Sequence, residues 1–89
     1  MAQYGTTISQ SSFVYDETTQ LYKTQIDTST IEDFNRGFNI TAIKVMRYIS
    51  ELQKFGEVLS YCEVDSSGIL TIYAHERFNL KVLIVTDQV

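Results

Sequence analysis

The chain has 89 residues, of which 44% are hydrophobic, and its 11 acidic and seven basic residues give a net charge of −4. This length and composition predict one small globular domain, and the thinly spread basic residues exclude nucleic acid and an acidic membrane surface as partners. The single cysteine, Cys62, and the single histidine, His75, exclude an internal disulfide and leave a metal site short of ligands. We therefore expect no metal and no cofactor.

The sequence also carries an expectation about location. No apolar run reaches the roughly 20 residues that span a bilayer. The N-terminus shows no basic segment followed by an apolar stretch, the pattern of a secretory signal. A lone cysteine suits a reducing compartment. These features predict a cytoplasmic protein with no membrane partner.

The N-terminal third is expected to contain a tail and a hairpin. Residues 1–11 are polar and rich in Thr, Ser and Gln, which predicts a flexible tail ahead of a single domain at residues 12–89. An edge strand is the alternative for this tail. Residues 13–15 and 20–26 alternate in polarity on either side of a turn-forming stretch at 16–19, which predicts a β-hairpin.

The middle of the chain shows helical spacing. Ser29 and Glu32 have the spacing of a capping box, which predicts a short helical turn at about residues 30–36. A long helix is predicted at about residues 40–55, because apolar side chains recur there in one stripe: Ala42, Val45, Ile49 and Leu52. Gly56 fits the left-handed residue that commonly ends a helix. The broad stripe indicates that this helix packs on one face of a sheet.

After Gly56 the pattern changes from helical spacing to alternation. Three further antiparallel strands are predicted, at about residues 58–64, 69–76 and 80–86, with a turn at 65–68 that uses Gly68 for positive φ. The expected fold is therefore α+β, in the order β-β-α-β-β-β. Its antiparallel sheet has four or five strands, and the helix covers one face.

The other face of such a sheet would be left for a partner. Alternation predicts that one set of side chains faces the helix: Val58, Leu70, Ile72, Ala74, Val82 and Ile84. The opposite face then carries Leu59, Tyr61, Tyr73, His75, Leu83 and Val85. A contiguous apolar patch on a small protein usually marks an interface, and tyrosine is a favoured anchor residue in interfaces. We therefore predict partner-binding roles for Tyr61, Tyr73, His75 and Leu83, with Phe13 or Tyr22 near the rim.

No catalytic motif is present. His75 is the only side chain with an ordinary pKa near neutrality, and no nucleophile is spaced to use it, while Cys62 falls on an alternating position that suits an inert core thiol. The leading hypothesis is a non-catalytic protein-interaction or regulatory module, such as an adaptor, a small regulator or an inhibitor, that binds another protein or a second copy of itself. One alternative is a small-molecule sensor or minimal enzyme with a pocket between helix and sheet. Another is a structural subunit of a larger assembly.

Overall fold

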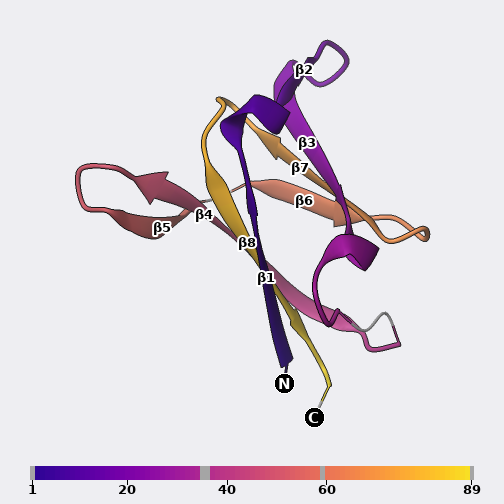
Figure 1. Cartoon of the computed structure of the whole chain (residues 1–89). Helices are drawn as coiled ribbons and strands as arrows, with labels where there is room; N and C mark the ends of the chain where they lie inside the picture. The colour runs from indigo at the N-terminus through magenta and orange to yellow at the C-terminus, as the bar shows by residue number, and fades with distance from the viewer. Residues whose placement is uncertain (1, 35–36, 59, 89) are drawn as a thin grey trace.

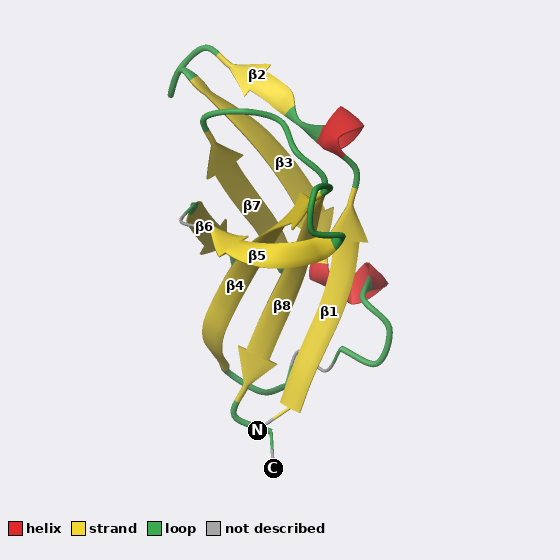
Figure 2. Ribbon diagram, turned by 90° about the vertical axis from the view of Figure 1, so that its left-hand side faces the viewer, coloured by secondary structure: helices red, strands yellow, loops and turns green. Residues whose placement is uncertain are grey.

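The computed structural model describes residues 2–34, 37–58 and 60–88, and strands dominate it (Figures 1 and 2). The strands are β1 (Ala2–Ile8), β2 (Val14–Asp16), β3 (Leu21–Asp27), β4 (Ile40–Ile49), β5 (Lys54–Val58), β6 (Tyr61–Val64), β7 (Ile69–Ala74) and β8 (Leu80–Thr86). Two short 3-10 turns, η1 (Gln10–Ser12) and η2 (Thr28–Thr30), are the only helical segments in these described ranges.

The strands form two four-stranded antiparallel sheets. The first sheet has the order β1-β8-β4-β5, and the second has the order β2-β3-β7-β6. The hairpins β2–β3, β4–β5 and β6–β7 fall alternately in the second, first and second sheet. β1 and β8, from the two ends of the chain, pair with each other. The two sheets therefore enclose one core between them (Figure 2).

The core is built mainly from one face of each of the strands β7 and β8. Alternate residues of these strands are fully or almost fully buried: Leu70, Ile72, Ala74, Leu80, Val82 and Ile84. The sequence predicted burial of the alternate residues of β7 and of Val82 and Ile84, and the structure confirms it. The surface that covers them is the other sheet and not the expected helix. Phe13 and Phe78 also belong to the core, with ring centroids 5.4 Å apart. Phe13, expected near the rim of the partner-binding face, is therefore buried instead. Burial of this apolar surface is the main force that holds the two sheets together.

The α+β prediction is wrong, because the predicted long helix at residues 40–55 is a β-hairpin. β4 and β5 pair from Val45 opposite Val58 to Ile49 opposite Lys54. Half of the ten residues of β4 are β-branched, and β-branched side chains fit a pleated strand better than a helix. The left-handed residue of the connecting turn is Gln53, with φ of 52°, rather than Gly56.

The predicted helical turn at about residues 30–36 is also wrong. The 3-10 turn η2 ends at Thr30, and its N-cap is Asp27, whose carboxylate accepts a hydrogen bond from the Ser29 amide. Residues 35 and 36 of the predicted turn lie outside the described residues. Ser29 was predicted to be the N-cap because of its spacing to Glu32. It lies instead inside η2, and Asp27 is the N-cap.

The structure confirms the hairpin at residues 13–26, where β2 and β3 pair, and the turn at 65–68, where Gly68 has φ of 82°. The prediction that the last three strands lie side by side in one sheet is only partly correct. β6 pairs with β7, but β8 leaves that sheet and pairs with β1 and β4. Residues 1–11, expected as a flexible tail, contain β1 at the edge of the first sheet, in agreement with the alternative of an edge strand. No helix in the described ranges is long and apolar enough to cross a membrane.

Candidate functional site

Tyr61 and Tyr73 form a cross-strand pair on the outer face of the second sheet. They lie directly opposite each other on β6 and β7, with ring centroids 5.7 Å apart. Tyr61 is 63% exposed, the highest value among the exposed large apolar side chains, together with Val14 and Leu52. Two large rings are thus held together at the surface by strand register. We call Tyr61 and Tyr73 the tyrosine pair.

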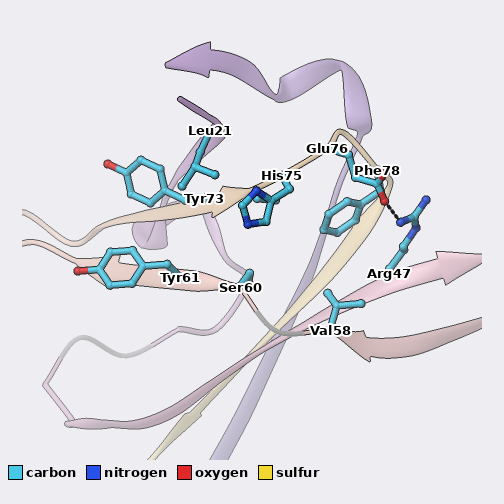
Figure 3. A pocket seen from close by; sticks show the side chains of 10 residues that line it. Leu21, Arg47, Val58, Ser60, Tyr61, Tyr73, His75, Glu76 and Phe78 are labelled. Carbon is cyan, nitrogen blue, oxygen red and sulfur yellow. Dashed lines mark hydrogen bonds and ion pairs between the residues drawn. The ribbon is translucent and has the colours of Figure 1, made fainter. Parts of the chain in front are cut away.

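The tyrosine pair borders a pocket of about 290 Å³ that also contains His75. Figure 3 shows His75 between the tyrosine pair at one end and Glu76 with Arg47 at the other. The remaining lining side chains are mostly apolar: Leu21, Val58, Ser60, Ala74 and Phe78. We call this site the tyrosine pocket. It combines an apolar lining with a few polar groups, the usual composition of a binding site.

The polar end of the pocket is held by an ion pair. The Arg47 guanidinium donates a hydrogen bond to the Glu76 carboxylate, and it lies 5.4 Å from the centroid of the Phe78 ring. Both charged side chains are substantially exposed. An exposed ion pair of this kind adds little stability. Its effect is to fix one positive and one negative group at the mouth of an otherwise apolar pocket.

The structure brings together Tyr61, Tyr73 and His75 but not the other two predicted partner-binding residues. Leu83 lies on the outer face of the first sheet, between Gly5 of β1 and Lys44 of β4. The residues predicted to share one exposed face therefore lie on the outer faces of two different sheets, because β8 belongs to the first sheet and β6 and β7 to the second. Val85, predicted to be exposed, is buried. Leu59 lies outside the described residues.

Tyr22 lies on the interior face of β3. It packs edge-on against Tyr15, with ring centroids 5.5 Å apart, and the Arg77 guanidinium lies 5.2 Å from its ring centroid. A guanidinium at this distance from an aromatic ring gives a favourable cation–π interaction. Tyr22 is half-buried by these contacts. Its neighbour Leu21, not Tyr22 itself, lines the tyrosine pocket.

A second group of exposed apolar side chains was missed, because it was assigned to the predicted helix. The β4–β5 hairpin projects from the body of the molecule (Figure 1). It carries Leu52 in its turn and the ring pair Tyr48 and Phe55, with centroids 5.2 Å apart. All three are exposed. The β-branched residues of β4 were the signal in the sequence for this hairpin.

Cys62 faces the interior from β6, opposite Ile72, and is half-buried. Desolvation by this burial raises the pKa of the Cys62 thiol, which disfavours the reactive thiolate. The Ser60 hydroxyl lies 3.7 Å from the Cys62 sulfur, within hydrogen-bonding range. Within the described parts of the chain, no three His, Cys, Asp or Glu residues are grouped as a metal site would need.

Comparison of the chain with protein families, with curated proteins and with solved structures found no significant match.

Proposed function

We propose that this protein is a non-catalytic binding module, which uses the tyrosine pair and the tyrosine pocket to hold a partner protein. The observation that supports this most directly is the exposure of Tyr61 in a pair fixed by the register of β6 and β7. Tyrosine gives a large contact area with few rotatable bonds, so an ordered pair binds at low entropic cost. The strands hold the pair in the free protein, before any partner arrives.

The size of the pocket suits one large side chain of a partner. Pockets for drug-sized molecules usually range from about 300 to about 1,000 Å³. At about 290 Å³, the tyrosine pocket lies at the lower end of that range. One large apolar side chain of a bound protein would fit it, while the surrounding surface, including the tyrosine pair, would make the wider contact. Arg47 and Glu76 at its mouth would select the charge around that side chain.

The experiment is capture of partners from the native host by the immobilised protein, with mass spectrometry of what is retained. The variant Tyr61→Ala should lose a partner that the wild type retains, by about tenfold or more for an anchor residue. Tyr61 is highly exposed, so the variant should keep the melting temperature of the wild type. Recombinant partner and isothermal calorimetry would then give the change in Kd.

A matched control is Tyr48→Ala, which removes an exposed tyrosine from the corresponding ring pair on the β4–β5 hairpin. It should capture the same partner as the wild type. Equal loss in Tyr48→Ala and Tyr61→Ala would show a general effect of surface tyrosines, and no loss in Tyr61→Ala would remove the tyrosine pair as the binding site.

A small-molecule sensor is the second candidate, and the observation that favours it is the pocket itself. The predicted position between helix and sheet is wrong, since residues 40–55 form strands. The lining comes from strands of both sheets and from the two segments that join them, β5 to β6 and β7 to β8. A ligand that binds only the folded state raises the melting temperature by mass action. A thermal-shift screen of metabolites should then give a specific hit that disappears in His75→Ala, which removes an exposed polar side chain from the lining and leaves the core unchanged.

A further inference from the structure

β1 lacks the features by which proteins usually protect the edge of a sheet. Charged residues, proline, bulges and short length are the common protections. β1 pairs with β8 over seven consecutive residues without a bulge, and it contains no charged residue and no proline. The other three edge strands are shorter, and each carries a charge: Asp16 in β2, Glu57 in β5 and Glu63 in β6.

The side of β1 that points away from β8 offers backbone groups for pairing. In the part of the chain that the structure describes, no backbone–backbone hydrogen bond joins β1 to a segment other than β8. The ring of Tyr4 contacts Phe34, with centroids 5.2 Å apart, but Tyr4 is paired with Ile84 and so faces the interior. The outer-face residues Gln3, Gly5 and Thr7 are exposed.

We propose that β1 is a dimerisation edge, which pairs antiparallel with β1 of a second copy about a two-fold axis at Gly5. Such an axis at the middle residue of β1 places Ala2 opposite Ile8, Gln3 opposite Thr7, and Tyr4 opposite Thr6 of the second copy. Ala2 then meets the apolar Ile8 at each end, the polar Gln3 meets Thr7, and Gly5, which has no side chain, lies on the axis. Interior-facing residues meet only interior-facing residues, so the two first sheets join into one continuous sheet without a change of face.

Lys81 sets the strength of this pairing. A Cβ placed on Gly5 would lie 3.3 Å from Cε of Lys81, so the lysine side chain extends across Gly5 on the outer face of β1. With the axis at Gly5, the Lys81 side chains of the two copies approach each other. Their repulsion weakens the dimer at low ionic strength, and added salt screens it. The dimer is therefore weak and becomes tighter as the salt concentration rises.

The test is sedimentation equilibrium of the full chain, of Lys81→Glu, and of an equimolar mixture of the two. In the mixture a lysine faces a glutamate across the axis, whereas each protein alone brings like charges together. The mixed dimer should therefore be tighter than either homodimer, by roughly fivefold at low salt. Lys44→Glu is the matched control, because Lys44 lies two strands away from the edge, on β4. Its mixture with wild type should show no such preference.

Two results would overturn the proposal. One is a monomer in every sample at the highest attainable concentration. The other is a dimer whose strength is the same in the Lys81→Glu mixture as in the wild type, since the interface would then lie away from Gly5. Neither result bears on the tyrosine pair, which lies on the other sheet and is tested separately by Tyr61→Ala.

Discussion

Thr28 donates two hydrogen bonds to one acceptor, the carbonyl oxygen of Gly68. The amide nitrogen of Thr28 lies 3.0 Å from that oxygen and its hydroxyl lies 2.7 Å away. These bonds join the end of β3 to the turn between β6 and β7. Thr28 is 1% exposed, so water cannot replace either bond.

We expect Thr28→Val to lower the free energy of unfolding by about 0.5–1.5 kcal/mol, because it removes one buried hydrogen bond and adds no volume, while the Thr28 amide still donates to the Gly68 carbonyl. Urea denaturation measures the change. Thr30→Val is the matched control: the Thr30 hydroxyl also donates at 2.7 Å, to the Asp27 carbonyl, but it is exposed. Its effect should be well below that of Thr28→Val, and an equal loss would contradict the role given to burial.

Thr24 should respond in the opposite direction. Its side chain is 2% exposed, and within the described residues its hydroxyl has no hydrogen-bond partner. A buried hydroxyl without a partner is costly, and valine has nearly the same shape. Thr24→Val should therefore raise the free energy of unfolding, by about 1 kcal/mol. A loss of stability in the same urea experiment would show that this hydroxyl is satisfied in solution.

Thr19 controls the titration of Asp16 in the β2–β3 turn. The Thr19 hydroxyl donates to the Asp16 carboxylate at 2.7 Å, and this bond is the main cause of the lowered pKa of Asp16. Thr19→Val should raise the pKa of Asp16 toward its ordinary value, as followed by NMR titration of the carboxyl group. The lowered pKa stabilises the fold above the ordinary pKa of an aspartate, and this contribution disappears as the pH falls through the folded value. Thr18→Val should leave most of the shift in place.

Cys62 should make the fold weaker in alkali. Burial raises the pKa of its thiol in the folded state, so the unfolded chain loses this proton at a lower pH than the folded chain. Deprotonation of the unfolded chain then favours unfolding as the pH rises above the ordinary pKa of a thiol. The stability of the wild type relative to Cys62→Ala should fall over that range. The thiol should also react slowly with a disulfide reagent until the protein is denatured.

The parts of the fold that the sequence predicted correctly depend on neighbours in the chain. The hairpin at residues 13–26 and the turn at Gly68 join strands that follow each other, and their turn residues are visible locally. Alternation also assigned the buried face of β7, because a strand buried on one face shows period two whatever its partner. The turns between consecutive strands and the buried face of β7 can therefore be predicted without knowing the sheet to which a strand belongs.

The error at residues 40–55 arose because two periods coexist there. Val45, Ile49 and Leu52 recur at helical spacing, while Ile43 and Val45 also alternate as a strand requires. The strand conformation of β4 depends on its pairing with β8, about 40 residues away in sequence. This pairing leaves no signal in the local sequence. Because β8 pairs with β4, Leu83 lies in the first sheet, away from Tyr61 and Tyr73 in the second. The predicted partner-binding face is therefore divided between the two sheets. Tyr61, Tyr73 and His75 came together because β6 and β7 are neighbours in both chain and sheet.

The place of β8 has a consequence for synthesis on the ribosome. β8 is the last strand of the described chain, yet it lies inside the first sheet and pairs with both β1 and β4. Until it emerges, β1 has no partner within its own chain, and the β4–β5 hairpin has no sheet to join. A nascent chain can complete the β2–β3 and β6–β7 hairpins early, but the core closes only once β8 has been made. A pause in synthesis just before β8 would therefore leave the apolar faces of the earlier strands exposed to water, whereas a pause before β2 would expose very little.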